Sequence, residues 1–190
     1  MSPIEIRKCN LNELQMYSKI PIAFQVESIY QIKANGTRGI ELYEEKVKNP
    51  YIKDYDAVKG EGPTRWLKRF DMSNWGIFRA FEDETAVGGA IVAPGIYLGD
   101  LDKRFSQLFD IRVHPEKRRY GIGTLLLSAV TDYVQQQSCK YLKIETQNTN
   151  VPACKFYMKR GCDLGSIERY AYIGYPENEQ EVRLVWYLSI

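Results

Sequence analysis

The stretch Arg118-Arg119-Tyr120-Gly121-Ile122-Gly123 decides how this sequence is interpreted, because it joins a predicted strand to a predicted helix. Before it, apolar and polar residues alternate with the period of a strand that Pro115 stops. The alternating positions are Phe109, Ile111 and Val113 against Asp110, Arg112 and His114. One face of this strand is therefore predicted to be apolar and the other to carry the chemistry.

After the stretch, apolar residues recur at the spacing of an amphipathic helix about four turns long. They are Ile122, Leu125, Leu126, Ala129, Val130, Tyr133 and Val134. The first amides of such a helix have no partner within it, and its positive end attracts anions. Two glycines keep side chains out of the way and tolerate positive φ. The junction therefore predicts a pyrophosphate site, with a solvated basic turn as the alternative.

Two other phosphate motifs do not fit this stretch. A Walker loop needs Gly-x-x-x-x-Gly-Lys-Ser/Thr, and a dinucleotide fingerprint needs a third glycine where this chain has Leu126. Both are excluded on spacing alone.

The rest of the chain reads as short strands and helices without repeats. Strands are predicted at residues 4–7, 76–81, 86–93, 141–146, 166–173 and 182–188. Helices are predicted at 11–19, at the spacing of Ile40, Tyr43 and Val47, and at 153–160, with Pro152 in its first turn and Gly161 at its end. Residues 23–33 are ambiguous, and 49–63 are predicted to be an exposed connection. This order indicates a mixed α/β fold of the α+β type, not a doubly wound sheet.

Composition narrows the functional classes. The 190 residues suit one domain, and 26 Lys+Arg against 24 Asp+Glu lack the basic excess of a duplex-DNA binder. Four cysteines without a Cys-x-x-Cys pair, together with the single His114, do not make a zinc site. They are Cys9, Cys139, Cys154 and Cys162, and we expect reduced thiols in the cytoplasm. A charged N-terminus and the absence of 18 consecutive apolar residues predict neither a leader nor a membrane span.

The glycine stretch resembles the signature of the GCN5-related N-acetyltransferase (GNAT) superfamily, Gln/Arg-x-x-Gly-x-Gly/Ala, which Arg118, Gly121 and Gly123 match. Residues 108–116 extend the match, and 150–161 are similar to the family's Asn-x-x-Ala-x-x-Phe-Tyr-x-x-x-Gly segment. Within the superfamily, residues 145–157 and Trp186-Tyr187 look most like the streptothricin acetyltransferase branch.

The resemblance implies a mostly antiparallel mixed sheet with splayed central strands flanked by helices. It also implies one domain over 1–190. Acceptor-side elements would occupy about 1–104, the acetyl-CoA core about 105–161, and C-terminal strands 162–190.

The same resemblance implies acetyl-CoA as the acyl donor and no metal. Pantetheine would bond to the backbone of Ile111, Arg112 and Val113. The pyrophosphate would lie on the loop formed by Arg118, Arg119, Tyr120, Gly121, Ile122, Gly123 and Thr124. Asn150, with Ala153, matches the segment near the pantetheine arm, and Asn150 is also a good helix cap.

Three residues are candidates for the chemistry. Tyr157 matches the family tyrosine whose hydroxyl faces the cofactor sulfur and stabilises the leaving thiolate, and its alternative is a core aromatic. An amine with a pKa of about 10.4 must lose a proton before it attacks. Asp110 is the first candidate base and Glu145 the second, with a water relay also open. Either acid could instead be a structural partner of Arg112 or Lys143, and His114 is predicted to be a turn residue.

These features predict direct transfer of acetyl from acetyl-CoA to the primary amine of a small molecule, without a covalent acyl-enzyme. A streptothricin-type antibiotic carrying a β-lysine amine is the specific expectation, which would make the protein a resistance enzyme. A polyamine, an amino acid or a protein amine is an alternative acceptor. An acyl-CoA sensor and a protein-interaction domain are the alternative functions. Neither nucleic acid nor a membrane is expected as a partner, and a homodimer is left open.

Overall fold

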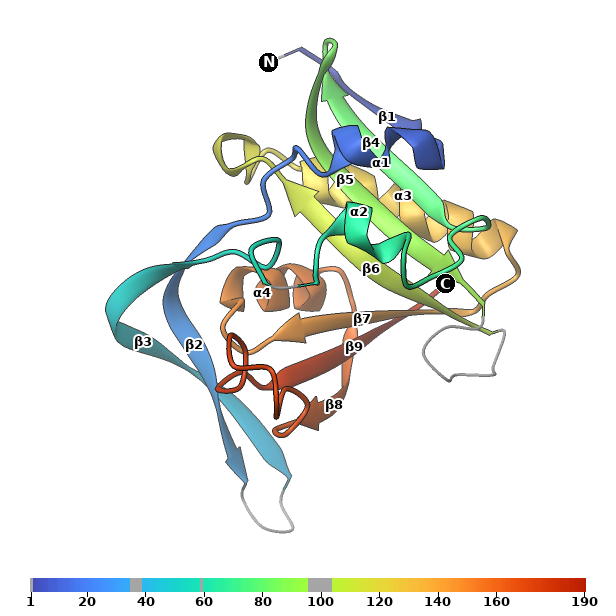
Figure 1. The fold of residues 1–190 in the computed structure, drawn as a ribbon. Helices are drawn as coiled ribbons and strands as arrows, with labels where there is room; N and C mark the ends of the chain where they lie inside the picture. Colours follow the sequence, from blue (N-terminus) through green and yellow to red (C-terminus); the bar gives the residue numbers. More distant parts are fainter. Residues whose placement is uncertain (1, 35–38, 59, 96–103) are drawn as a thin grey trace. The chain divides into compact units, whose positions relative to one another are not determined.

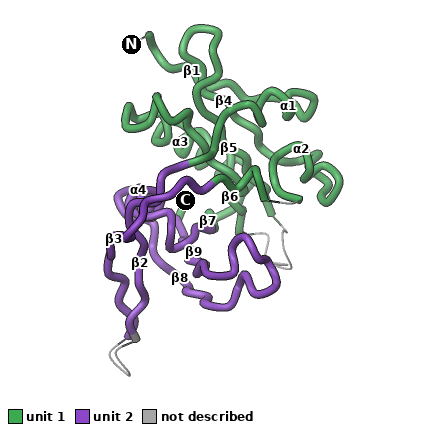
Figure 2. Tube along the Cα trace, turned by 60° about the vertical axis from the view of Figure 1, so that its left-hand side comes forward, with its two compact units in different colours: residues 1–23, 54–144, 189–190 green, residues 24–53, 145–188 purple. Residues whose placement is uncertain are grey.

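The computed structural model describes residues 2–34, 39–58, 60–95 and 104–190, which form two compact units (Figures 1 and 2). Unit 1 comprises residues 1–23, 54–144 and 189–190, and unit 2 comprises 24–53 and 145–188. The expectation that both units act as one domain stays a prediction.

Unit 1 is built on a sheet whose strands follow the order β1-β4-β5-β6-β7. Neighbours are antiparallel except β6 and β7, which are parallel over Phe105–Leu108 and Tyr141–Ile144. The strands are β1 (Ile4–Lys8), β4 (Gly76–Glu82), β5 (Thr85–Pro94), β6 (Phe105–Val113) and β7 (Tyr141–Gln147), whose end belongs to unit 2. The helices are η1 (Leu11–Glu13), α1 (Leu14–Tyr17), α2 (Pro63–Trp66), η3 (Pro115–Lys117) and α3 (Ile122–Gln136).

Helices cover both faces of β4, β5 and β6 in unit 1. Figure 1 shows α3 on one face and α1 with α2 on the other. Two adjacent glycines of β5 allow both approaches, since a Cβ on Gly88 would lie 3.1 Å from Ile122 and one on Gly89 would lie 2.4 Å from the Tyr17 ring. The strand centre is therefore dry on both sides, unlike a sheet with one solvated face.

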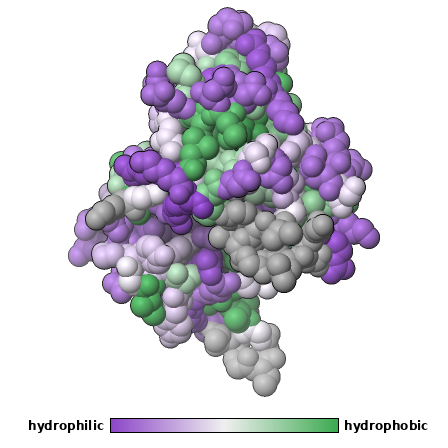
Figure 3. Space-filling model, turned by 45° about the vertical axis from the view of Figure 1, so that its right-hand side comes forward, coloured by the Kyte–Doolittle hydropathy of each residue, from purple (hydrophilic) through white to green (hydrophobic). Residues whose placement is uncertain are grey.

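The α1/α2 side of the sheet holds an apolar cluster with several aromatic rings. Its buried members are Cys9, Leu14, Tyr17, Trp66, Met72, Trp75, Ile77, Ile91 and Ala93, with Leu11, Phe70 and Phe109 packed against them. The rings of Trp75 and Phe109 lie 4.6 Å apart, and those of Trp66 and Phe109 meet edge to face at 5.1 Å. Figure 3 shows hydrophobic side chains gathered on one face of the molecule among hydrophilic ones.

The polar residues predicted to alternate along β6 lie in the core of unit 1. Asp110 and Arg112 are buried, whereas Phe109, Ile111 and Val113 are half-buried. The pairing with β5 shifts at Phe109, because Ile91 pairs with Asp110 and Val92 with Leu108. An extra residue of this kind breaks strict alternation, and Phe109 and Asp110 both contact members of the cluster on the α1/α2 side.

Unit 2 combines a two-stranded ribbon with the end of β7 and the C-terminal strands. The ribbon pairs β2 (Phe24–Ala34) with β3 (Ile40–Lys53) in antiparallel fashion, and the remaining strand order is β7-β9-β8. These strands are β9 (Arg183–Ser189) and β8 (Asp163–Glu168), and the helix of the unit is α4 (Val151–Lys159). The ambiguous segment 23–33 thus forms most of β2.

The helix predicted from Ile40, Tyr43 and Val47 is wrong, because this segment is β3. Most of β3 is exposed. Neither face of this strand has to be apolar, and its sequence therefore lacks the two-residue period of a half-buried strand. The predicted connection also begins later than residue 49. Pro50 lies in β3, between the pairs Ser28–Lys46 and Val26–Tyr51 where the register is irregular, a position that proline tolerates.

Two other boundaries differ from the prediction. Segment 11–19 forms a 3₁₀ turn and a one-turn helix instead of one continuous helix. β8 ends at Glu168, and turns follow where a strand was predicted to residue 173. The other predicted strands, α3 and α4 are confirmed to within a few residues, as is the mixed, mostly antiparallel α/β class.

Candidate active site

The predicted phosphate loop leads into α3 through two residues with positive φ. Gly121 caps the helix at φ +83°, and Arg119 also has a positive φ of +73°. The amides of Thr124 and Leu125 already donate to the Gly121 carbonyl. Arg119 and Tyr120 are exposed, whereas Ile122 is buried. The amides of Ile122 and Gly123 precede the two donating amides in the first turn of the helix, so they lie at its positive end beside the exposed Arg119.

The two arginines of the loop differ in their contacts. Arg118 donates from Nη2 to the Ala23 carbonyl at 2.7 Å and from Nε to the Val113 carbonyl at 3.0 Å. Burial lowers the pKa of this guanidinium, because removal from water disfavours the charged form. Arg118 thus ties the loop to the end of β6 and to the chain before β2, while Arg119 stays exposed.

Asp110 is the centre of a buried ionic network in unit 1. Its Oδ1 accepts from the Tyr17 hydroxyl at 2.6 Å and from Arg112 Nε at 2.8 Å, and its Oδ2 accepts from Arg112 Nη2 at 2.5 Å. Only 3% of the Asp110 side chain is exposed. Arg112 also donates to Asp56 at 2.6 Å and 3.1 Å and to the Ile20 carbonyl at 3.0 Å.

The protonation states in this network follow from burial and charge. Burial and then the Asp110 charge raise the pKa of Tyr17 well above its usual value, so the phenol stays neutral. Burial alone would lower the pKa of Arg112, but the charge and hydrogen bonds of Asp110 outweigh it and hold that pKa above its usual value. The structural role left open for Asp110, as partner of Arg112, is thus present in the fold.

In unit 2, Asn150 stands at the start of α4 and Tyr157 lies on this helix. Asn150 caps the helix, since its Oδ1 accepts from the Ala153 amide at 3.2 Å. Tyr157 is buried and its ring meets that of Phe156 edge to face at 5.3 Å. Gly161 ends the turn with φ +81°, the conformation that glycine adopts without strain.

A chain of polar contacts attaches α4 to the strands beneath it. Trp186 Nε1 on β9 donates to the Thr146 hydroxyl at 2.8 Å, and that hydroxyl lies 3.4 Å from the Cys154 sulfur. Burial raises the pKa of the Cys154 thiol to about 11, so this thiol is protonated and unreactive at neutral pH. Cys154 and Tyr157 are three residues apart and share the buried face of α4.

Glu145 lies in a more open setting than Asp110, since 33% of its side chain is exposed. Its Oε1 accepts from the Tyr172 hydroxyl at 2.8 Å, and that hydroxyl accepts from Gln147 Nε2 at 2.7 Å. Its Oε2 lies 3.5 Å from Arg183, which donates to Glu168 at 2.8 Å. Glu145 is therefore in contact with a phenol and a guanidinium.

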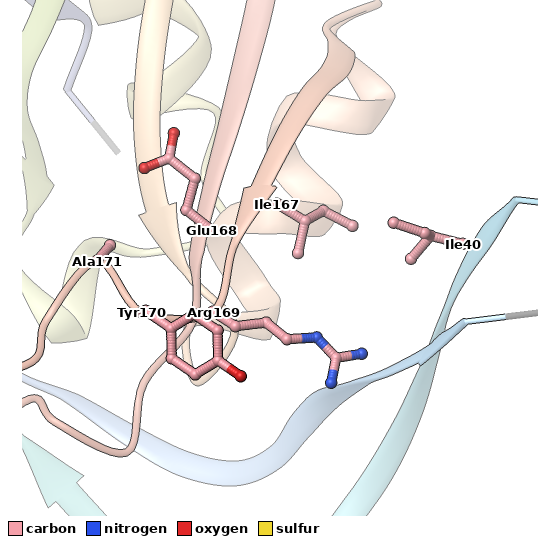
Figure 4. A pocket seen from close by; sticks show the side chains of 6 residues that line it. All are labelled: Ile40, Ile167, Glu168, Arg169, Tyr170 and Ala171. Atoms are coloured by element: carbon pink, nitrogen blue, oxygen red, sulfur yellow. The ribbon is translucent and has the colours of Figure 1, made fainter.

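An open hollow of about 500 Å³ lies beside the end of β8 (Figure 4). It is lined by Ile40, Ile167, Glu168, Arg169, Tyr170 and Ala171. Its charged groups already have partners, since Glu168 pairs with Arg183 and Arg169 donates to the Ile32 carbonyl at 3.1 Å. We assign no chemistry to it.

The structure therefore groups the predicted residues by unit. Asp110, Arg112 and the glycine loop belong to unit 1, whereas Glu145, Asn150, Ala153 and Tyr157 belong to unit 2. Sequence reasoning missed Tyr17, Asp56 and Tyr172, and no local pattern distinguishes the two tyrosines from the other twelve.

Within the described parts of the chain, no cluster of three His, Cys, Asp or Glu side chains could hold a metal ion. A search of the same residues finds no helix long and apolar enough to cross a membrane.

Comparison with known proteins identifies the class of enzyme to which this fold belongs, the acyl-CoA-dependent N-acyltransferases. Residues 37–162 match the sequence model of the acetyltransferase (GNAT) family. The chain is 30% identical over 157 residues to streptothricin acetyltransferase A of Bacillus subtilis, covering 78% of this chain and 80% of that protein. It is 27% identical over 164 residues to a streptothricin acetyltransferase of Escherichia coli, with 86% and 84% covered. The chain belongs to the GNAT acetyltransferase family.

Solved structures share the fold. A nourseothricin acetyltransferase superposes with a TM-score of 0.78 at 21% identity, covering 98% of both chains. A Bacillus anthracis protein described as a streptothricin acetyltransferase, solved with acetyl coenzyme A, superposes with a TM-score of 0.78 at 24% identity, covering 99% of this chain and 98% of that one. The family match and the likeness to the two streptothricin acetyltransferases make the chain an acetyl-CoA-dependent N-acetyltransferase.

Proposed function

We propose that the acceptor is a primary amine of a streptothricin-type antibiotic, and that the protein confers resistance by acetylating it. The observation that carries this proposal is the likeness to two proteins named streptothricin acetyltransferase over about four fifths of the chain. A β-lysine amine is the expected nucleophile, because it is a basic primary amine that becomes a neutral amide when the acetyl group is transferred.

Acetyl-CoA would be held by the loop and the segment that the motif assigns to it. The backbone at Ile111, Arg112 and Val113 would bind pantetheine, and residues 118–124 would bind the pyrophosphate. The exposed Arg119 and the amides at the start of α3 support this assignment. Because Asn150 caps α4 through the Ala153 amide, its part in cofactor binding would be to fix the start of that helix.

The transfer itself needs three proton steps. The ammonium gives a proton to a base, the freed lone pair attacks the thioester carbonyl, and the C–N bond forms as the C–S bond breaks. Tyr157 would protonate the leaving thiolate, the newly bonded nitrogen would release its second proton to solvent as the neutral amide forms, and Tyr157 would regain its proton from solvent. Glu145 is favoured as the base because 33% of its side chain is exposed, against 3% for Asp110. In addition, both oxygens of Asp110 already accept hydrogen bonds from Arg112 and Tyr17.

Thioester consumption with a panel of amines tests this function. Streptothricin should be acetylated with the highest kcat/KM, ahead of a polyamine, a free amino acid and a peptide amine. A higher kcat/KM with one of the latter would replace the acceptor and keep the enzyme class. If no amine supports turnover, CoA binding by calorimetry would identify an acyl-CoA sensor of the same fold.

We further propose that the enzyme acts in the cytoplasm as one functional domain formed by both units. The four cysteines support this compartment, since all of them are free thiols and buried.

A further inference from the structure

Tyr172 contacts Glu145, the carboxylate proposed above as the base. The tyrosine lies in a part of the chain without regular secondary structure. It lies in the turns between β8 and β9, at residues 169–182. Three other large side chains of this segment, Tyr170, Ile173 and Tyr175, are exposed by 58% or more. Tyr172 alone among these four points inward, to the Glu145 carboxylate at 2.8 Å.

The direction of the Tyr172 hydroxyl follows from its second contact. Gln147 lies two residues after Glu145 on β7, and its Nε2 donates to the phenol oxygen at 2.7 Å. A phenol that accepts from the amide places its own proton toward the other neighbour, Glu145 Oε1. The carboxylate thus receives one defined hydrogen bond on one oxygen.

The segment that carries Tyr172 is anchored on both sides within unit 2. The Val182 amide donates to Asn148 Oδ1 at 2.8 Å, and Lys53 pairs with Glu181 at 2.8 Å and donates to Asn178 Oδ1 at 2.7 Å. The Tyr175 amide donates to the Tyr172 carbonyl at 3.0 Å. These contacts hold the phenol in place before any acceptor arrives.

We infer that Tyr172 is a positioning residue for catalysis: its hydroxyl holds Oε1 of Glu145, so that Oε2 is left to accept the proton of the acceptor ammonium. This inference rests on the proposed function, which supplies the amine. The charged groups around Glu145 are Arg183 on β9, at 3.5 Å from Oε2, and Glu168 on β8, which engages Arg183. Lys143 precedes Glu145 by two positions on β7.

The direction in which the pH profile moves depends on which protonation state of Glu145 the phenol stabilises. A donor stabilises the charged carboxylate, so its loss moves carboxyl titration to higher pH. In Tyr172→Phe we expect the acidic limb of the kcat/KM profile to move to higher pH, with kcat/KM at neutral pH lower by about tenfold. Adding the change to Glu145→Gln should cost nothing more, because the carboxylate is then absent.

The matched control is Tyr170→Phe, a phenol of the same segment that is 78% exposed and should leave the profile unchanged. Should Tyr172→Phe not fold, Gln147→Leu removes the donor that orients the phenol and should move the profile in the same direction. A wild-type pH profile in folded Tyr172→Phe, or an equal shift in Tyr170→Phe, would overturn the inference.

A second readout does not depend on turnover. The ¹³C titration of the Glu145 carboxyl, assigned by its loss in Glu145→Gln, should shift upward in Tyr172→Phe and not in Tyr170→Phe. No turnover by the wild type with any amine would reject the proposed function. An unshifted carboxyl titration would reject the Tyr172 inference, so the two failures are distinguishable.

Discussion

The two candidate acids, Asp110 in unit 1 and Glu145 in unit 2, are each contacted by a tyrosine and an arginine, yet their surroundings differ. Asp110 has 3% of its side chain exposed and both oxygens bound by a buried arginine, whereas Glu145 has 33% exposed and an arginine at 3.5 Å. A carboxylate bound on both oxygens is a poor proton acceptor, because protonation would break its ion pair. The difference teaches that residue type alone does not decide whether an acid is free to accept a proton.

The largest expected effect is a difference in stability between variants of the two arginines, Arg112 and Arg183. Arg112→Met should lower the free energy of unfolding by about 3–5 kcal/mol, because it leaves the Asp110 carboxylate buried without its ionic partner. Arg183 is one-third exposed, so Arg183→Met should cost no more than about 1 kcal/mol. Urea unfolding of both variants measures the contrast. Equal losses would mean that the two networks are equally structural.

Replacing each acid in turn by its amide tests which of the two is the base. Glu145→Gln should keep its stability and lose kcat by about 10²-fold, the scale of a positioned acid or base. Asp110→Asn should lose roughly 1–3 kcal/mol of stability, the cost of an unsatisfied buried group. Steady-state kinetics beside urea unfolding separates the two effects. A stable Asp110→Asn protein with strongly reduced kcat would restore Asp110 as the base.

Tyr157 extends the comparison to the candidate proton donor, which lies in the same unit as Glu145. Phenylalanine keeps the ring and removes only the oxygen, so Tyr157→Phe should lower kcat by about 10²-fold while CoA affinity changes little. Rapid-quench kinetics and calorimetry with CoA measure the two quantities. An unaltered kcat, with chemistry rate-limiting, would make Tyr157 an ordinary core aromatic.

The two phenols predict how stability depends on alkaline pH. Burial raises the pKa of both Tyr17 and Tyr172 above the usual value near 10. Above that pH the unfolded chain releases these protons while the folded chain keeps them. Their stabilisation is therefore present below about pH 10 and is lost as pH rises, by up to about 1.4 kcal/mol per pH unit for each phenol.

Urea unfolding between pH 8 and 11 tests this dependence, with Tyr17→Phe and Tyr172→Phe each expected to flatten it. A variant curve parallel to that of the wild type would show that the phenol in question titrates normally.

The smallest effect concerns the arginines of the glycine loop. Arg119→Ala should weaken CoA binding severalfold and reduce its dependence on salt, since an exposed charge acts through a screened field. Arg118 donates to backbone carbonyls, so Arg118→Ala should chiefly lower the melting temperature. Calorimetry with CoA at two salt concentrations and thermal unfolding distinguish them. A salt-sensitive loss confined to Arg118→Ala would make Arg118 the phosphate ligand.

Local elements and their ends were predictable from the sequence. The spacing from Ile122 to Val134, the cap at Asn150 and the stop at Gly161 all correspond to observed features. Each depends on hydrogen bonds and side-chain positions only a few residues apart, which a linear pattern records. The glycine loop belongs to this class, because its φ values and helix amides are local. Leu125 is the exception on α3, since it is exposed by 44%.

Only the tertiary structure decided what surrounds each acid. Tyr17 lies 93 residues before Asp110 and Tyr172 lies 27 residues after Glu145, so no local period relates them. The register shift at Phe109 brings it and Asp110 against the same cluster, and alternation could not reveal it. β3 escaped prediction for a related reason: an exposed ribbon is held by strand pairing and needs no apolar face. Pattern specifies elements, whereas burial and charge at a site depend on distant residues that meet only after folding.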